Sequence, residues 1–263
     1  MTSMPPVTTP SDPRAADSVS RRSRPERVAE AIKSWVVAEN MAPGDKLPGE
    51  QELIARFGMA KGTIREAMRL LEAQGLVKTR TGPGGGSFVH AVSEARAQAL
   101  LGNYFYFRHL TIADIYDLRI ALEPELAASL AGRLGDADIA ALEANIARYD
   151  TPPATADEDR AQHVASLEFH RILASYAENP LLGFVIGFMS NMLSDITVSR
   201  RLYEPRNYDL WRRGRDHQRA LVRALREGDA EAARQTMAAH MRGARDLMEV
   251  QEARMARRFL PDR

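Results

Sequence analysis

The sequence contains no cysteine, which excludes a disulfide framework and thiolate chemistry. It shows no apolar run approaching the roughly 18 to 20 residues that span a bilayer, and its first residues contain no apolar segment of the signal-peptide kind. The formal net charge is +1, so any surface for nucleic acid must concentrate its cations locally. These absences predict a protein without a membrane partner, and we expect a cytoplasmic location.

Length and composition indicate two globular domains. A chain of 263 residues with 44% hydrophobic and 27% charged residues is long enough for two ordinary cores. Residues 1–24 combine proline, serine and threonine with a short basic cluster, which predicts a disordered tail. We expect one domain over residues 25–91, a second, all-helical domain over 92–254, and a C-terminal tail over 255–263.

The first domain has the pattern of a winged helix-turn-helix. Apolar residues at helical spacing predict a helix over residues 26–39 and a second, short helix over 50–57. A third helix begins near Lys61, only a few residues later, as a helix-turn-helix requires. Two β-prone runs, residues 76–80 and 87–89, then flank a glycine-rich loop and predict a hairpin wing.

The third helix carries cations on a face that does not pack. Lys61, Arg65 and Arg69 lie at i, i+4 and i+8, where like charges repel one another unless an anion approaches. An arginine fork matches the O6 and N7 acceptors of guanine, so we interpret Arg65 as a base reader and Lys61 as a point charge beside it. The glycine-rich loop has a plainer alternative interpretation, as a mobile turn without a partner.

These residues carry a family resemblance. The stretch "MAPGDKLPGEQELIARFGMAKGTIREAMRLLEAQGLVKTRTGPGGGSFV" resembles the DNA-binding domain of GntR-type bacterial transcription regulators. The resemblance implies that the third helix enters the major groove and that the wing tip approaches the minor groove. Gln51 stands where many members have arginine, which implies a weaker or different contact. The predicted DNA-binding residues are Lys61, Thr63, Arg65, Gln51, Arg69, Gly84, Gly85 and Gly86.

The second domain has almost no strand signal after Ala91. Six or seven helical segments with short connections predict an antiparallel bundle, so the whole chain is predicted to be mostly α with one small β-hairpin. Thr111 and Asp114 are expected to open the second segment and Asp136 the third. Pro180 is expected in the first turn of the fifth.

Three histidines are expected to point into this bundle from different helices. His170, His217 and His240 each share a helix face with apolar residues. A lone histidine on such a face is usually a satisfied core residue, whereas side chains from facing helices are what bundles use to build metal sites. Neutral imidazoles suit zinc or nickel. A divalent metal is therefore one prediction for these residues, and a core role is the alternative.

The histidine pattern and the segment "IYDLRIALEPELAASLA" resemble the FCD ligand-binding domain of the FadR-type subfamily. Many members hold a divalent metal with one aspartate and three histidines, and the resemblance places Ser166 at the aspartate position. Arg119 matches an arginine that often grips the effector's carboxylate, with an internal ion pair to Glu123 as the alternative. Asn191 is a weaker candidate, with a core or capping role as its alternative. The predicted effector-binding residues are Arg119, Ser166 and Asn191.

The combined interpretation is a transcription regulator, a repressor, that responds to a small organic acid. One short recognition helix reads too few bases alone, which favours a homodimer on an inverted-repeat operator in double-stranded DNA. The resemblance implies that the helical domain supplies the main dimer surface, to which the apolar residues of "LLGNYFYF" are expected to contribute. A different class is a zinc hydrolase built on the three histidines, although no inward carboxylate stands out as its general base. A third is a DNA-binding architectural protein without an effector.

Overall fold

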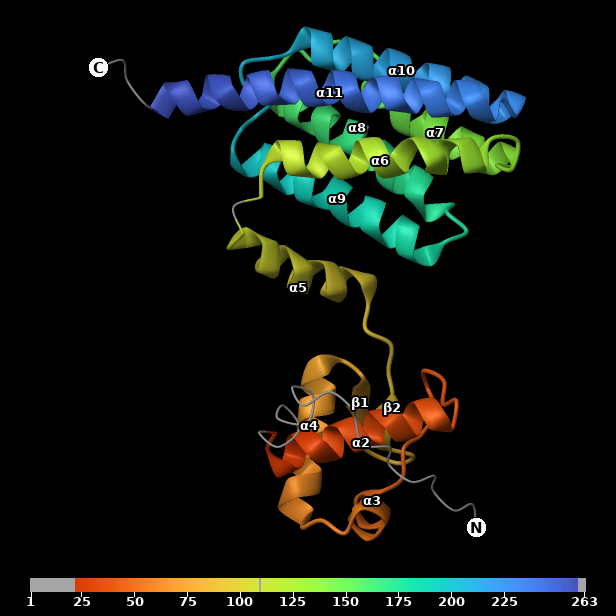
Figure 1. The fold of residues 1–263 in the computed structure, drawn as a ribbon, viewed down its shortest axis with the longest axis vertical. Coiled ribbons are helices and arrows are strands. Elements are labelled where there is room, and N and C mark those ends of the chain that lie inside the picture. Colours follow the sequence, from red (N-terminus) through yellow and green to blue (C-terminus); the bar gives the residue numbers. More distant parts are fainter. Residues whose placement is uncertain (1–21, 109, 260–263) are drawn as a thin grey trace, which may run out of the picture. The chain divides into compact units, whose positions relative to one another are not determined.

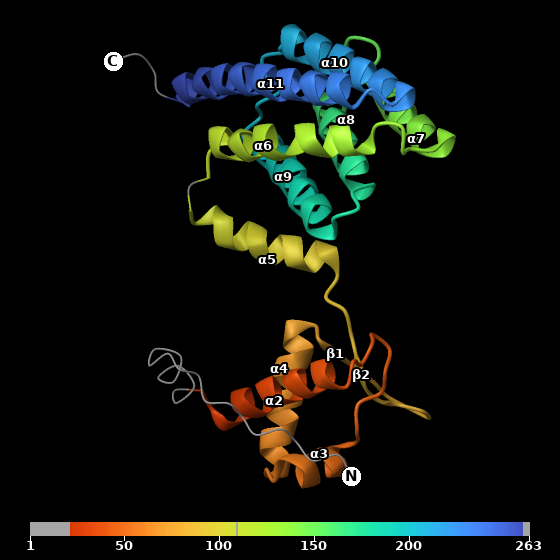
Figure 2. The same cartoon turned by 45° about the vertical axis from the view of Figure 1, so that its right-hand side comes forward.

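The structure of the protein is a computed structural model that describes residues 22–108 and 110–259. The tail expected over residues 1–24 lies outside the described residues as far as position 21. The chain divides into two compact units between Ala97 and Gln98, later than the boundary predicted after residue 91. Figures 1 and 2 show the elements of each unit.

The first unit is a winged helix-turn-helix, as predicted. Helices α2 and α3 both pack against α4, and the two strands pair antiparallel, from Val77 opposite Val89 to Arg80 opposite Gly86. Its elements are α2 (Arg24–Ala38), α3 (Glu50–Phe57), α4 (Lys61–Gln74), β1 (Val77–Arg80) and β2 (Gly86–Val89). Its buried apolar core includes Val28, Ile32, Leu53, Ile64, Leu71 and Val77.

Local sequence signals set the ends of these elements. Ser23 and Glu26 form a capping box at the start of α2. Helix α4 ends before Gly75, whose φ of 80° lies in the left-handed region that glycine adopts without steric cost. The wing turn also requires glycine at position 85, because a Cβ there would lie 2.5 Å from the carbonyl oxygen of Arg80.

The second unit is a helical bundle, also as predicted. Helix α11 packs against α6 and α10, α8 packs against α9 and α7, and α6 packs against α9. Helices α6 and α11 run in opposite directions (Figure 1). The helices that follow the wing are α5 (Glu94–Tyr106), α6 (Ile112–Leu130), α7 (Asp136–Ala147), α8 (Ala156–Ser175), α9 (Pro180–Ser199), α10 (Tyr208–Glu227) and α11 (Ala230–Phe259). The tail expected from residue 255 is therefore helical as far as Phe259.

The predicted helix starts agree closely with the structure. Thr111 and Asp114 form a capping box at α6, and Pro180 is the first residue of α9. At α7 the N-cap is Gly135, and Asp136 is the first helical residue.

The expectation that no apolar run reaches membrane-spanning length is wrong for α9. This helix is long and apolar enough, with a mean hydropathy of 1.6, to cross a membrane by length and composition. Polar residues such as Ser190 and Asp195 interrupt the run and obscure it in the sequence. Ile186, Met189 and Leu193 are buried in the bundle core. We therefore interpret α9 as a core helix.

Candidate functional site

The cations of α4 lie on the exposed side of that helix. Ile64 and Leu71 are buried in the core of the first unit. By contrast, the side chains of Lys61, Arg65 and Arg69 are 56%, 58% and 77% exposed. The apolar face of α4 packs into the core of the first unit, and its cationic face stays accessible to an anion from outside.

Two of these cations have an acidic partner that the sequence does not predict. The side chain of Glu50 in α3 lies 3.2 Å from Lys61 Nζ and 2.6 Å from Arg65 Nε. The hydrogen bond from Arg65 lowers the pKa of Glu50. Arg69 lies 3.5 Å from Glu66 on its own helix. The repulsion predicted between these like charges is therefore offset within the protein itself, because the carboxylate of Glu50 on the neighbouring helix lies beside two of them.

A groove borders both α4 and the wing. Its lining includes Arg65 and Arg69 of α4 together with Gly85 and Gly86 of the wing. Cations together with closely approachable backbone are what recognition of bases and phosphates uses. The other predicted contacts lie outside the lining of this groove: Lys61, Thr63, Gln51 and Gly84.

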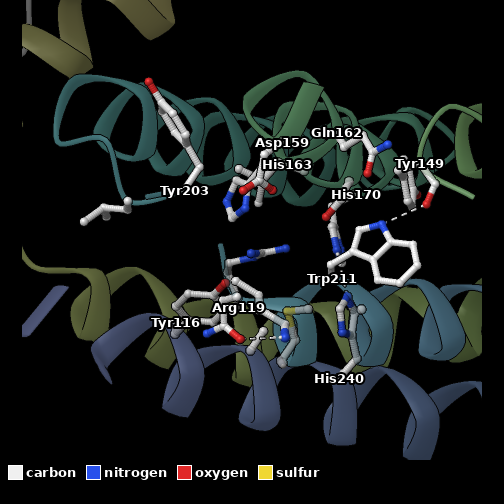
Figure 3. A pocket seen from close by; sticks show the side chains of 18 residues that line it. Tyr116, Arg119, Tyr149, Asp159, Gln162, His163, His170, Tyr203, Trp211 and His240 are labelled. Atoms are coloured by element: carbon white, nitrogen blue, oxygen red, sulfur yellow. Dashed lines mark hydrogen bonds between the residues drawn. The ribbon is translucent and has the colours of Figure 1, made fainter. Parts of the chain in front are cut away.

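The helical unit encloses a cavity of about 50 Å³. Residues of α6, α8, α10 and α11 contribute to its wall (Figure 3). Pockets for drug-sized ligands measure roughly 300–1,000 Å³, so this cavity suits a small molecule. Its lining includes Tyr116, Arg119, Tyr149, Asp159, Gln162, His163, Ser166, His170, Tyr203, Trp211 and His240.

Arg119 is buried in this wall, with 1% of its surface exposed. Its Nε donates a hydrogen bond to Glu123 Oε1 at 2.5 Å. The internal ion pair considered as the alternative is therefore present. The pair occupies one side of the guanidinium and leaves the other side at the cavity.

Four buried polar atoms of the cavity lining lack a hydrogen-bond partner among the described residues. We call them the open polar atoms: Arg119 Nη2, His163 Nε2, Asp159 Oδ2 and Gln162 Oε1. In Figure 3 the guanidinium of Arg119 lies opposite His163 and Asp159. Nearly all buried polar groups in proteins have a partner, so these atoms mark places for water or a ligand.

Helix α8 supplies most of the polar lining. Asp159, His163, Ser166 and His170 lie at i, i+4, i+7 and i+11, which places them along one face of the helix. Burial, with the charge of Arg119 nearby, lowers the pKa of His163 to about 4, so this ring is neutral at pH 7. The sequence interpretation missed Asp159 and His163. Extending the face of His170 backwards along α8 would have found both.

His170 and His240 face each other deep in the unit. Their Nε2 atoms are 3.3 Å apart, and His170 Nδ1 lies 2.5 Å from Glu123 Oε2. Burial alone would raise the pKa of Glu123, but Arg119 and His170 lower it to about 2. Burial lowers the pKa values of both histidines. The two rings are therefore neutral neighbours beside an ionised carboxylate.

His217 does not complete a cluster with them. Its ring lies 5.4 Å from that of His240, its Nδ1 is 2.7 Å from the carbonyl oxygen of Arg213, and it borders a separate cavity of about 10 Å³. The side chain near His170 is instead Gln218, whose Nε2 lies 3.3 Å from His170 Nε2.

The predicted metal donors fit an ion only in part. Two imidazole nitrogens bound to a tetrahedral zinc at about 2.0–2.1 Å lie about 3.4 Å apart, and His170 and His240 have nearly this spacing. Within the described chain, however, no group of three His, Cys, Asp or Glu side chains is arranged to hold a metal ion. His217 is turned to a backbone carbonyl, and Ser166 offers no carboxylate.

Asn191 lies outside the lining of the larger cavity. Its Nδ2 donates a hydrogen bond to Gln98 Oε1 at 2.6 Å, which joins α9 to α5. We therefore replace its predicted effector role with this contact between helices. Ser166, by contrast, does line the cavity.

Known proteins match both units. Residues 24–89 match the family described as bacterial regulatory proteins, gntR family, and residues 114–243 match the FCD domain. The chain is 26% identical to the HTH-type transcriptional repressor NanR of Citrobacter rodentium, over 85% of this chain and 84% of that protein. It is 29% identical to NanR of Edwardsiella tarda over 61% of each. The solved structure of Streptococcus agalactiae GntR has the same fold, with a TM-score of 0.57 at 23% identity over 84% of this chain and 99% of that one.

Proposed function

Since the chain belongs to the GntR family of bacterial regulatory proteins and carries an FCD domain, we propose that it is a repressor controlled by a small carboxylic acid. It is a transcriptional regulator rather than an enzyme, so the zinc hydrolase alternative no longer applies. Relatives named as repressors support that direction of control. We place its action in the cytoplasm, where operator DNA is accessible.

The observation that carries the acid effector is the open Nη2 of Arg119 at the cavity wall. A guanidinium forms charge-assisted hydrogen bonds with carboxylates. His163 offers a second donor, because its neutral ring can carry the hydrogen on Nε2. An acid held by both residues would join α6 to α8. To change operator affinity, it must bind one conformation of the protein more tightly than another.

We propose that the regulator acts as a homodimer on an inverted repeat. Exposed apolar side chains on and just after α5 support a self-association surface. Leu100, Tyr104, Tyr106 and Phe107 are 61%, 53%, 80% and 78% exposed. Light scattering should give the mass of a dimer at micromolar concentration. A monomer whose DNA footprint lacks a repeat would contradict this assembly.

A divalent metal, zinc or nickel, is a separate proposal for His170, His217 and His240. It is supported by the spacing of His170 and His240, and by Glu123, which orients His170 as outer carboxylates do in metal sites. Dialysis against zinc or nickel followed by metal analysis tests it. One equivalent should bind the wild type and less should bind His217→Ala, whereas an exposed control, His90→Ala, should match the wild type. Metal-free wild type after dialysis would assign the histidines to the core.

The proposed function is tested by DNA binding in the presence of acids. Genomic fragments selected by the purified protein should share an inverted repeat, and footprinting should protect both halves. Titration with carboxylic acids of two to four carbons should then reduce operator binding for at least one acid. An intact footprint that no acid alters would favour the architectural protein.

A further inference from the structure

Two of the open polar atoms are acceptors, Asp159 Oδ2 and Gln162 Oε1. An ionised carboxylate satisfies neither, because it has no hydrogen to donate. We propose that the effector is a short carboxylic acid that also carries a hydrogen-bond donor, a hydroxyl or an ammonium group. Its carboxylate binds Arg119 and His163, and its donor group binds Asp159, which Figure 3 shows beside His163. This inference rests on the proposed acid effector and specifies its chemical class.

Asp159 is positioned with an oxygen available to the cavity. Its side chain is 14% exposed, and Arg206 Nε lies 3.9 Å from Oδ2, too far for a hydrogen bond. Arg206 does not come closer because its Nη1 and Nη2 donate to the carbonyl oxygens of Pro153 and Ala154, at 2.9 and 2.7 Å. Burial raises the pKa of Asp159, as expected for a carboxylate that has lost hydrogen bonds to water. A ligand donor would supply the missing bond.

The proposed carboxylate and donor contacts face one cavity. All four open polar atoms belong to residues that line the same space of about 50 Å³. Asp159 and His163 are one helical turn apart on α8, and Figure 3 shows their side chains together, across from Arg119. We therefore expect a short acid with its donor on the second or third carbon to fit between Asp159 and Arg119 better than an acid with a longer chain.

Calorimetry with three acids on the same three-carbon frame tests the proposal. The probes are propanoate, 2,3-dihydroxypropanoate and 3-aminopropanoate. At least one donor-bearing acid should bind tenfold or more tighter than propanoate, as a single hydrogen bond to a charged acceptor supplies. The preference between the last two distinguishes a hydroxyl from an ammonium ligand.

Two variants test whether the preference for a donor-bearing acid over propanoate depends on Asp159. In Asp159→Ala the preferred acid should bind within about threefold of propanoate, with operator binding retained as evidence of folding. Asp157→Ala removes an exposed carboxylate two positions away on the same helix, and it should keep the full preference. Persistence of the preference in Asp159→Ala would overturn the assignment.

The outcomes separate this inference from the function on which it rests. Equal binding of all three acids by the wild type would mean that water satisfies the acceptors, which overturns the donor requirement and leaves the acid effector intact. If the three acids do not bind and no acid of two to four carbons alters operator affinity, both proposals fall.

Discussion

Arg119 and Glu123, one turn apart on α6, form a buried ion pair that leaves one side of the guanidinium for the cavity. Nε and Oε1 are 2.5 Å apart, whereas Nη2 has no hydrogen-bond partner in the part of the chain that the structure describes. The pair fixes the guanidinium before a ligand arrives. Such preorganisation lowers the entropy lost when a carboxylate binds.

Replacing Arg119 by lysine should therefore weaken acid binding at least tenfold. Lysine keeps a cation beside Glu123 but lacks the planar fork that addresses two partners at once. Alanine is a poorer probe, because an unpaired buried Glu123 costs roughly 3–5 kcal/mol of stability. Calorimetry measures the effect, and Arg133→Lys, at an exposed arginine, is the matched control. Undiminished acid affinity in folded Arg119→Lys would rule out this anchor.

Arg65→Lys should reduce sequence preference more than overall DNA affinity. The ammonium retains the positive charge, but it cannot form two parallel hydrogen bonds with guanine. We expect discrimination at one operator position to fall by roughly 1–3 kcal/mol. Competition assays with single-base operator variants measure it. An unaltered preference at every position would exclude Arg65 as a base reader.

Glu50→Gln should strengthen binding to DNA of any sequence while reducing the advantage of the operator. The variant removes an anion beside Lys61 and Arg65, and it also removes the contact that orients Arg65. Fluorescence anisotropy over a range of salt concentrations measures both effects. Glu30→Gln on α2, where the carboxylate pairs with Lys33, is the control. Weaker binding to all sequences would show that Glu50 has a different role.

Stability should fall as the pH drops from about 6.5 towards 4, in part through His163. Its pKa in the folded chain is about 4, against an ordinary 6.5. Between these values the unfolded chain binds more protons, so stability rises with pH. His163→Gln should reduce the loss between pH 7.5 and 4.5 by about 2 kcal/mol in urea unfolding. The exposed control His90→Gln should show the full loss, and an equal loss in His163→Gln would contradict the burial of this ring.

The sequence predicted the elements well because their signals are local. Apolar spacing, the caps at Thr111 and Pro180, and the glycines that end helices act within a few residues of the structure that they determine. The cationic face of α4 was predictable for the same reason, since residues i and i+4 of one helix must share a side.

The parts that escaped prediction depend on contacts between helices. Glu50 meets Arg65 only after α3 packs beside α4. Asn191 contacts Gln98 on another helix. His217 is an exception, because its ring contacts the carbonyl oxygen of Arg213 one turn earlier on α10, a side-chain orientation that periodicity does not encode. Asp159 and His163 could have been predicted, because their spacing from His170 places all three side chains on one face of the same helix.

The central claim, that an acid in this cavity controls operator binding, is tested most directly by one paired titration. Operator affinity is measured by fluorescence anisotropy against increasing concentrations of the tightest-binding three-carbon acid, for the wild type and Arg119→Lys in parallel. We predict that saturating acid weakens operator binding at least tenfold in the wild type, and that the concentration needed in Arg119→Lys is at least tenfold higher. The same response at the same acid concentration in both proteins would contradict the account.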